Sequence, residues 1–475
     1  MSLSALEQRL SSGLDYLNFP RREWVPRREH CGQHVLDVAI IGAGQSGLAT
    51  AFGLRLENIK NVVVLDKRQP DTVGPWRTFA RMKTLRTPKF GSGLDFGNPD
   101  LTPQAWYEAR FGKEAWNALG KMPTDLWHEY LEWYRRALSI PVQYGVTVES
   151  ILPDSDCLRL TCAGGEIIFA RRVVLATGLD GSGRWYLPPI VNNLPKACYG
   201  HTEERIDFSA LKGKRVGVLG GGASAFDNAA TAIEAGAQSV DLCIRAPQLP
   251  RINPNKWMEF SGFLGHYAEL TDDRKWRFMH QIGSMLQPPP QETLWRCNRH
   301  EQFALHTGSP WLEAWQSDSC VGIKTPHREF EFDFLIFGTG LTHDLKCRPE
   351  LSGIADEVAL WQDRFRPAEG LEAGHLMASP YLGPGFEFLE KRPGAAPHLG
   401  KIHNFTHGAM LSLGLNAASI TGMKYGVRRL VRALSCSLFI EDADEHFNSL
   451  TSYTEPEIWT LDPEAVAQKK TSNAA

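Results

Sequence analysis

The chain of 475 residues contains the same kind of glycine-rich turn twice, each time between an apolar strand pattern and a helix pattern. The first turn, GAGQSG, spans residues 42–47 and follows the apolar run Val35–Ile41. The second turn, GGGASA, spans residues 220–225 and follows Lys214–Leu219. A buried strand that leads through such a turn into a helix forms the βαβ unit that binds a dinucleotide pyrophosphate. The sequence therefore predicts an α/β fold with two Rossmann-like dinucleotide-binding domains.

The first unit carries the complete G-x-G-x-x-G pattern, and an acidic residue closes its second strand pattern. Its first glycine allows the tight turn, the second lets a pyrophosphate approach the backbone, and the third lets helix and strand pack closely. Asp66 stands 24 positions after Gly42, which is typical of a carboxylate that binds a ribose diol. The predicted nucleotide contacts of this unit are Gly42, Gly44, Gln45, Ser46, Gly47, Asp66 and Lys67.

The second unit has nearly the same length but a different closing residue. Arg245 stands 25 positions after Gly220, where the first unit has an acid. A carboxylate there repels a 2′-phosphate, whereas a guanidinium can donate a forked, charge-assisted pair to it. The second unit is therefore predicted to prefer NADP(H), with an ordinary surface arginine as the alternative reading. The predicted contacts are Gly220, Gly222, Ala223, Ser224, Ala225 and Arg245.

Two further buried strand patterns end at a Thr-Gly turn, VVLATG at residues 173–178 and FLIFGTG at residues 334–340. Such a turn lets the backbone approach a bound nucleotide or enter the neighbouring domain. Because each pattern stands where one of the two units would be completed, we predict cofactor contacts from Thr177, Gly178, Thr339 and Gly340.

Composition excludes several classes of function. The formal net charge is −3, so no electrostatic feature favours nucleic acid or an anionic membrane. The apolar stretch at residues 35–54 breaks into strand, turn and helix, which argues against a membrane span. Nine scattered cysteines form no disulfide framework, which favours the cytoplasm. Leucines at helical spacing in residues 3–17 indicate a docking helix, with a homodimer contact as the alternative.

These motifs together resemble the single-component flavin-dependent monooxygenases. This family of two-dinucleotide-binding flavoproteins includes flavin-containing monooxygenases, Baeyer–Villiger enzymes and the ornithine and lysine N-hydroxylases. The resemblance runs from about residue 35 to residue 435. It rests on GAGQSG, Gly74-Pro75-Trp76, VVLATG, GGGASA, DFLIFGTGL with Gly338 in place of the family's alanine, and Thr406-His407-Gly408.

The resemblance implies FAD in the first unit, NADPH in the second and O2 as co-substrate. NADPH would reduce the flavin, which would form a C4a-peroxide with O2 and transfer one oxygen atom to a small molecule. Such chemistry needs a cavity closed to water rather than many acid–base side chains. The THG stretch, which is similar to one in the N-hydroxylases, favours a nitrogen as the atom oxygenated. No metal site is predicted.

The resemblance also implies a domain layout. The FAD-binding domain is expected at residues 35–195 and 330–440, and the NADP(H)-binding domain at residues 196–329. An aromatic insert without clear periodicity occupies residues 253–315, an N-terminal arm residues 1–34 and a C-terminal tail residues 441–475.

Candidate side chains follow from the stretches that would surround the flavin. Flavin contacts are predicted from Trp76, Arg81 and Thr84, and from Asn416 as the N-cap of a last helix over residues 416–434. Arg86, Asn404 and His407 are the candidate catalytic residues. Substrate contacts are expected from residues 253–315 and 375–410, with Lys256 and His306 as examples, and His403 is a further candidate near the last helix.

Four alternative functions remain open at this point. A Baeyer–Villiger enzyme should carry a longer signature before the second turn, and only YGHT with His201 is present. A flavin disulfide reductase needs a redox cysteine pair, and Cys157 and Cys162 lie five positions apart in a strand pattern, where side chains point to opposite faces. An NADPH oxidase or quinone reductase would not transfer oxygen, and a nucleotide-binding sensor would not catalyse.

Overall fold

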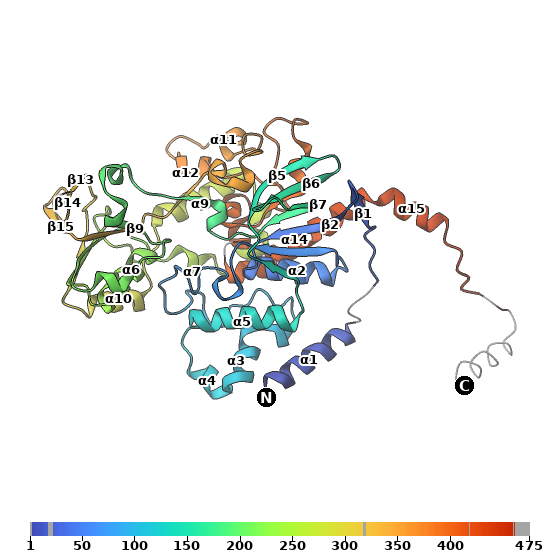
Figure 1. Cartoon of the computed structure of the whole chain (residues 1–475), viewed down its shortest axis with the longest axis horizontal. Helices are drawn as coiled ribbons and strands as arrows, with labels where there is room; N and C mark the ends of the chain where they lie inside the picture. The colour runs from blue at the N-terminus through green and yellow to red at the C-terminus, as the bar shows by residue number, and fades with distance from the viewer. Residues whose placement is uncertain (1, 18–21, 317–319, 418, 459, 461–475) are drawn as a thin grey trace. The chain divides into compact units, whose positions relative to one another are not determined.

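Two largely parallel sheets, one for each glycine turn, organise the first 435 residues of the protein (Figure 1). The computed structural model describes residues 2–17, 22–316, 320–417, 419–458 and 460. These divide into one unit over residues 1–435 and another over residues 436–475, which are described separately. The α/β fold class that the sequence predicts is confirmed, with one Rossmann-like sheet behind each turn.

The helices of the first unit stand singly between strands in some places and follow one another in others. They are α1 (Leu3–Tyr16), α2 (Gln45–Leu56), α3 (Pro103–Phe111), α4 (Lys113–Ala118), α5 (Thr124–Ala137), α6 (Ala223–Glu234), α7 (Pro254–Met258), α8 (Ser261–His266), α9 (Asp272–Met285), α10 (Gln291–Asn298), α11 (Trp361–Arg364), α12 (Gly374–Met377) and α13 (Met410–Leu413), followed by α14 (Ile420–Glu441), which runs into the second unit.

The first sheet contains the first glycine turn. Its strands are β1 (Arg28–His30), β2 (Gln33–Ile41), β3 (Val62–Asp66), β4 (Val142–Tyr144), β5 (Val148–Asp154), β6 (Cys157–Cys162), β7 (Ile167–Leu175) and β18 (Ile402–Asn404). The order is β4-β3-β2-β7-β6-β5, with β18 also parallel to β7. In register, Ile41 stands opposite both Leu65 and Leu175, and Asn404 stands opposite Leu175. The carboxyl ends of these four strands therefore meet at one edge of the sheet.

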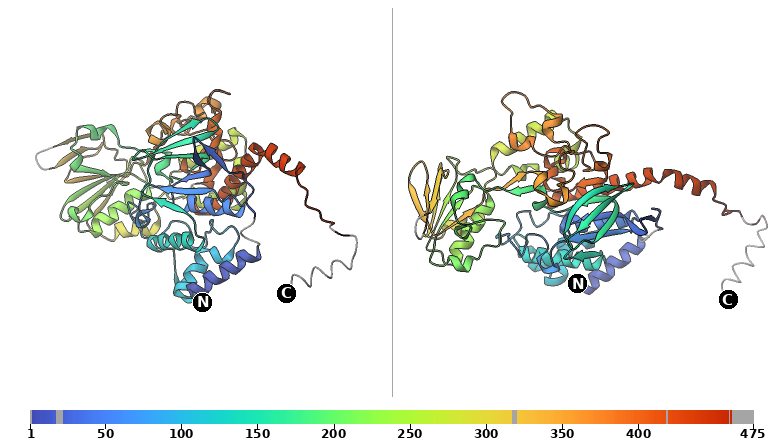
Figure 2. Two further views of the ribbon diagram at one scale, coloured as in Figure 1. Left: turned by 45° about the vertical axis from the view of Figure 1, so that its right-hand side comes forward. Right: turned by 45° about the horizontal axis from the view of Figure 1, so that its top comes forward.

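The second sheet contains the second glycine turn, and all of its pairings are parallel. Its strands, in spatial order, are β12 (Phe303–His306), β11 (Ser239–Cys243), β10 (Arg215–Leu219), β16 (Phe334–Phe337) and β9 (Tyr199–His201). Apolar side chains of α6 and α10 pack on one face. A small antiparallel sheet of β13 (Glu313–Gln316), β14 (Val321–Lys324) and β15 (Glu329–Phe332) packs on the other (Figure 2).

The strand of the FLIFGTG motif corrects the domain boundary at residue 330. β16 pairs with β10 and β9, so this strand belongs to the second sheet rather than to the FAD-binding half. Only after Gly340 does the chain leave that sheet, through β17 (Leu341–His343), which pairs with β8 (Gly183–Trp185). The boundary error arose because a buried apolar strand looks the same in either sheet, and only the pairing distinguishes them.

The insert at residues 253–315 is mainly helical, and it contacts both halves. Its helices α8 and α9 bury Phe263 and Trp276 against Trp361 and Leu411 from the late part of the chain. Helix α10 instead packs on α6, and β12 joins the second sheet. The absence of a clear period in the sequence reflects several short helices in succession, none of which repeats its pattern for long.

The last long helix starts later and ends later than the sequence predicts. It covers Ile420–Glu441, and Asn416 ends a short 3-10 turn before it. The Ser419 hydroxyl accepts a hydrogen bond from the Gly422 amide at 2.9 Å, as an N-cap residue does. Asn416 is therefore not the cap.

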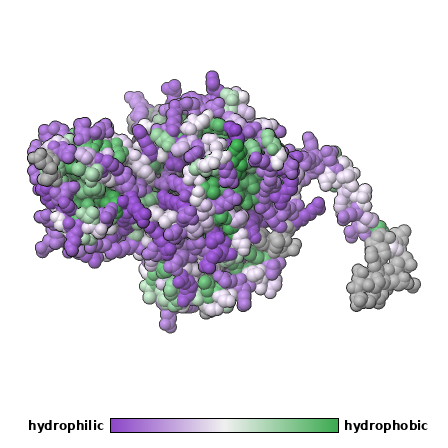
Figure 3. All heavy atoms as spheres, in the orientation of Figure 1, coloured by the Kyte–Doolittle hydropathy of each residue, from purple (hydrophilic) through white to green (hydrophobic). Residues whose placement is uncertain are grey.

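The N-terminal leucines form the docking helix that their spacing predicts. Helix α1 buries Leu6 and Leu10, and Trp133 of α5 donates to Glu7 at 3.0 Å. In the second unit, α15 (Ala443–Thr451) lies within the predicted tail. Hydrophilic residues cover most of the face shown in Figure 3. No described helix has both the length and the apolar content that a membrane span requires.

Candidate functional site

The first turn is glycine-rich because the backbone packs too closely for side chains. Gly42 has a φ of 109°, and a Cβ there would lie 2.4 Å from the Ala176 carbonyl oxygen of the VVLATG strand. A Cβ on Gly47 would lie 1.8 Å from the carbonyl oxygen of Gly42. Gly44, by contrast, has no atom within 4 Å of such a Cβ. The turn is thus closed beneath its first and third glycines and open above its second.

Asp66 braces this turn from the end of β3. Its Oδ2 accepts from the Ala43 amide at 2.8 Å, and its Oδ1 accepts from the Arg68 amide at 2.8 Å. The carboxylate is buried, and its bond to Ala43 holds it beside the glycine turn, where the sequence predicts a ribose contact. The neighbouring Lys67 is exposed.

The second turn has the same geometry with one exchange of small residues. Gly220 has a φ of 145°, and a Cβ there would lie 2.3 Å from the Gly338 carbonyl oxygen. A Cβ on Gly338 would lie 2.6 Å from that of Ala225. The first unit has glycine at position 47 and alanine at position 176, whereas the second has Ala225 and Gly338 at the corresponding places. The departure of Gly338 from the family's alanine is thus explained by the alanine at position 225.

Both turns fit a dinucleotide. Helix α2 starts after Gly44 and helix α6 after Gly222, and neither helix has a side-chain cap or an acid in its first turn. A Cβ added at Gly222 would have no neighbour within 4 Å, as at Gly44. The first-turn amides and the positive end of each helix dipole are therefore left to receive an anion such as a pyrophosphate.

Side chains around the first turn connect it to the helices above. Gln45 accepts from the Trp127 indole at 3.2 Å, and Trp127 packs edge-on against Trp76 at 6.5 Å between ring centroids. The Ser46 hydroxyl lies 3.5 Å from the Met423 sulfur of α14. Trp76 is thereby held near the turn, as the predicted flavin contact requires.

The segment after Trp76 leads from the first half toward the second. Arg81 donates to the Thr78 carbonyl at 2.7 Å and stacks over Phe208, with 5.1 Å from its guanidinium carbon to the ring centroid. Thr84 forms an isolated β-bridge with Pro123. Burial lowers the pKa of Arg81, and it raises the pKa of the nearby Glu203 carboxyl to about 8.

A polar cluster lies at the edge of the first sheet where β7 and β18 end. The Ser182 hydroxyl donates to Thr406 at 3.2 Å and accepts from the Gly408 amide at 2.9 Å. Thr406 in turn donates to the side-chain oxygen of Asn404 at 2.7 Å. The THG stretch is thus tied to the end of the VVLATG strand, which brings Asn404 and His407 to the same place as Thr177 and Gly178.

Two imidazoles stack beside this cluster. The rings of His343 and His407 lie 5.9 Å apart between centroids, with 10° between their planes. His343 Nδ1 lies 3.2 Å from the Ser182 carbonyl oxygen. Because a carbonyl oxygen can only accept a hydrogen bond, Nδ1 carries the proton and Nε2 keeps a lone pair. Burial lowers the pKa of His407 to about 4, with the His343 ring acting in the same direction. Burial also lowers the pKa of His343. Both rings are therefore uncharged at neutral pH.

Several buried polar atoms around the first site have no hydrogen-bond partner within the described residues. Unpaired groups of this kind are costly, so their clustering points to a ligand that pairs with them. Three of these atoms, Thr177 Oγ1, Asn404 Nδ2 and His407 Nδ1, belong to this edge, and a fourth, Asn416 Oδ1, belongs to the turn before α14. All four residues are among those that the sequence predicts for the FAD site or for catalysis.

Other predicted residues lie elsewhere. Arg245 and Ser224 are exposed at the second turn, where a nucleotide would meet them. Thr339 donates to the Tyr186 carbonyl and Gly340 accepts from the Tyr186 amide at 2.9 Å, so this turn joins the two halves. Lys256 is exposed on α7.

Two residues suggested from the sequence have other partners. His306 lies in the second sheet, 2.7 Å from the Asp241 carboxylate, and is not brought to the edge of the first sheet. It is therefore not a substrate contact at that edge. Arg86 donates to Asp227 of α6 at 3.1 Å rather than pointing free into the site.

The sequence missed three residues that the fold brings into play: Ser182, His343 and Asp227. His343 stands three positions after the GTG turn, and Asp227 follows the second fingerprint by two positions. Their closeness to motifs was a usable signal, but their partners lie 64 and 141 positions away, at His407 and Arg86.

Comparisons with known proteins place the chain among flavoproteins. The profile of the pyridine nucleotide-disulphide oxidoreductase family matches residues 39–260. The FAD-dependent urate hydroxylase of Xanthomonas campestris pv. campestris is 42% identical over 473 residues, which cover 98% of this chain and 100% of the relative. The chain belongs to the family of FAD-dependent hydroxylases that this relative represents.

Solved structures of N-hydroxylases share the fold of this hydroxylase. The ornithine hydroxylase of Pseudomonas aeruginosa superposes with a TM-score of 0.66 at 16% identity, over 85% of this chain and all of its own. The ornithine N-hydroxylase of Kutzneria sp. 744, solved with reduced FAD, NADP+ and L-ornithine, gives 0.66 at 15% identity, over 85% of this chain and 99% of its own.

The family membership decides between the functions that the sequence left open. The protein is an FAD-dependent monooxygenase, an oxidoreductase, as the sequence predicts. The cysteine pair required of a disulfide reductase is absent from the site: Cys157 and Cys162 are free thiols at opposite ends of β6. The isolated YGHT stretch places His201 at the end of β9, where its ring lies 5.4 Å from that of Trp185 between centroids, with 34° between the planes.

Proposed function

We propose that the hydroxylase uses NADPH and O2 to introduce one oxygen atom into a small nitrogen-rich molecule, and that urate is its substrate. The observation that carries this proposal is the 42% identity, across 98% of the chain, with an FAD-dependent urate hydroxylase. The atom that receives the oxygen stays a prediction, and the THG stretch favours a nitrogen.

The two glycine turns divide the cofactor work in this proposal. The first turn, Asp66 and Trp76 hold FAD, which supplies the redox and oxygen chemistry when bound. The second turn admits NADPH, and the exposed Arg245 guanidinium binds its 2′-phosphate. The absence of a side-chain cap at either helix leaves both N-termini to the pyrophosphates.

The cluster at the edge of the first sheet handles the substrate. Asn404 has an unpaired amide donor, and His407 has an unpaired ring nitrogen, so both can bind the polar edge of a heterocycle. Since His343 donates its Nδ1–H to the Ser182 carbonyl oxygen, the Nε2 lone pair of His343 can accept a proton from a substrate N–H or O–H group. Burial lowers the pKa of His343, so its ring is neutral at neutral pH and the Nε2 lone pair is available to a substrate.

The test follows consumption and product together. In the proposed reaction, NADPH, a proton, O2 and substrate give NADP+, hydroxylated substrate and water, so NADPH, O2 and urate disappear in equal amounts. Mass spectrometry with 18O2 should place one labelled oxygen in the product. Equal NADPH loss with stoichiometric hydrogen peroxide and unlabelled urate would support the oxidase alternative instead, and labelled ester from a ketone would support the Baeyer–Villiger alternative.

We also propose a cytoplasmic location. All nine cysteines are free thiols, which fits a reducing compartment. Cell fractionation with an antibody against the purified protein tests this.

A further inference from the structure

Positively charged side chains of the half that contains the first sheet pair with negatively charged side chains of the half that contains the second sheet. Lys83 pairs with Glu234 at 2.9 Å, Arg86 pairs with Asp227 at 3.1 Å, and Lys121 pairs with Glu292. The three cations come from the loops at residues 83–86 and 121, and the three carboxylates come from α6 and α10. We call these six residues the interface clamp.

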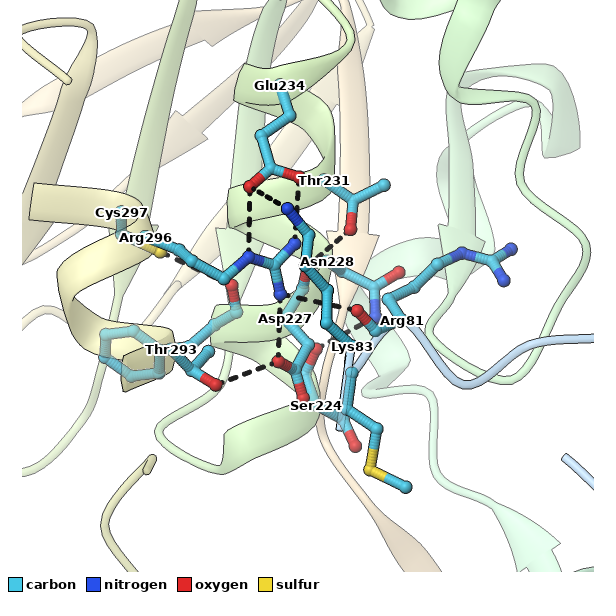
Figure 4. Close-up of polar contacts among 12 residues, drawn as sticks. Arg81, Lys83, Ser224, Asp227, Asn228, Thr231, Glu234, Thr293, Arg296 and Cys297 are labelled. Atoms are coloured by element: carbon cyan, nitrogen blue, oxygen red, sulfur yellow. Dashed lines mark hydrogen bonds and ion pairs between the residues drawn. The ribbon is translucent and has the colours of Figure 1, made fainter. Parts of the chain in front are cut away.

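Asp227 is the buried centre of the clamp. It is 2% exposed, and each of its oxygens has a partner. Oδ1 accepts from the Thr293 hydroxyl at 3.1 Å and lies 3.4 Å from Arg296 Nη1 (Figure 4). Oδ2 accepts from Arg86 at 3.1 Å. Arg86 is the partner from the first half. Because a buried carboxylate must be paired, the Asp227 side chain favours the arrangement in which Arg86 reaches it.

Arg296 fixes the second half of the clamp as one body. Its Nε and Nη2 each donate to Glu234 at 3.0 Å, the two-pronged geometry that holds α10 against α6. Its Nη1 also reaches the Arg81 carbonyl oxygen at 3.4 Å, so Arg296 itself contacts the first half (Figure 4).

The clamp lies between the two cofactor sites. Asp227 stands two positions after Ala225 on the helix whose N-terminus faces the NADP(H) pyrophosphate. The segment of Lys83 and Arg86 is anchored to the first half by Leu85, whose amide donates to Met122 at 2.8 Å, and it follows the predicted flavin contact Trp76. The spacing of the two cofactors therefore depends on the contact between these segments.

We propose that the interface clamp positions α6, and with it the nicotinamide, for hydride transfer to the flavin, with Arg86 and Asp227 as positioning residues. This inference rests on the proposed use of NADPH. Arg86 then acts through α6 and not on the substrate. A displacement of a reacting group by about an ångström slows its reaction steeply. The clamp should therefore affect hydride transfer from NADPH to the flavin more than any other step.

The first experiment measures anaerobic flavin reduction by NADPH in a stopped-flow instrument. Arg86→Gln should slow reduction by about ten-fold or more at saturating NADPH, and high ionic strength should slow the wild type in the same direction. Lys121→Glu should slow it less, because that pair is partly exposed, and adding Glu292→Lys should restore the rate. Lys324→Gln, which breaks the Lys324–Glu313 pair within the small antiparallel sheet, is the matched control.

A second readout does not require NADPH. Amide hydrogen exchange in the purified flavoprotein should rise over residues 81–86 and 223–234 in Arg86→Gln and remain unchanged in Lys324→Gln. Unchanged exchange together with reduction within about two-fold of wild type would overturn the clamp. If NADPH fails to reduce the flavin of the wild type, the proposed function is wrong. Faster exchange in Arg86→Gln would then report a structural contact alone, and the positioning role would be overturned as well.

Discussion

At the scale of single residues, the two turns differ most at the position that closes each unit. Asp66 is buried and accepts two backbone amides, whereas Arg245 is exposed and makes no hydrogen bond or ion pair with the described residues. The acid thus has a structural task in addition to any nucleotide contact. The arginine has its whole guanidinium available for a ligand.

Arg245→Ala is expected to weaken NADPH binding by about 1.5–3 kcal/mol, the range for a lost hydrogen bond to a charged group. NADH, which lacks the 2′-phosphate, should be affected little. Titrations of NADPH and NADH with wild type and variant measure the change, and Lys324→Ala, at a partly exposed lysine in the small antiparallel sheet, serves as the control. Equal use of both nucleotides by the wild type would contradict the assignment of Arg245.

The exchange of glycine and alanine between the two turns gives a second residue-scale prediction. A Cβ on Gly338 would lie 2.6 Å from the Ala225 Cβ, so Gly338→Ala should destabilise the protein by about 1–3 kcal/mol through overpacking. Adding Ala225→Gly recreates the arrangement of the first turn and should recover part of the loss. Urea unfolding of both variants tests this, and no recovery in the double variant would argue against a direct clash.

At the scale of elements, α14 shows how a helix boundary depends on one hydroxyl. The spacing of Ile420, Met423, Val427 and Leu430 predicts the buried face, and all four are buried. The start was misplaced because Asn416 and Ser419 are both favourable caps, and the sequence does not decide between them. Packing decides: the Asn416 carbonyl oxygen lies against Gly426, where a Cβ would come within 2.4 Å.

Ser419→Ala should cost about 1 kcal/mol of stability because the Gly422 amide loses its acceptor. Ser419→Gly should cost only a few tenths of a kcal/mol, because glycine is a tolerated N-cap, and this makes it the matched control. Chemical denaturation monitored by circular dichroism measures both. A glycine variant as unstable as the alanine variant would mean that the hydroxyl acts elsewhere.

At the scale of the whole molecule, buried neutral histidines make stability depend on pH. Burial lowers the pKa of His201 in the second sheet and of His403 in the first sheet to about 4 each. The unfolded chain binds these protons near pH 6.5, before the folded protein does. The contribution of these two histidines to the free energy of unfolding should therefore be fully present above pH 6.5 and be lost as the pH drops from 6.5 toward 4.

Each of these two histidines should contribute a loss of up to about 1.4 kcal/mol per pH unit within that window. Urea unfolding at pH values of about 7.5, 6 and 5 measures the slope. His403→Gln should reduce the slope, and the exposed His266→Gln is the control. A slope that His403→Gln leaves unchanged would show that His403 does not stay neutral in the folded protein.

The amino-acid sequence by itself determined the two strand–turn–helix units and their glycines. These features are local: where a Cβ would lie 2.4 Å from a neighbouring carbonyl oxygen, as at Gly42, only glycine fits, so the residue type records the geometry. The apolar runs of β2, β7 and β10 record burial on both faces in the same way.

Only the tertiary structure decided which sheet β16 joins, that His343 stacks on His407, and that Arg86 pairs with Asp227. In each case the partners are separated by dozens of positions or more, and neither residue carries a mark of the other. An apolar strand pairs with any parallel neighbour, and an arginine pairs with any carboxylate it can reach. The choice among such partners is made by the packing of the whole fold, which no short stretch of the chain contains.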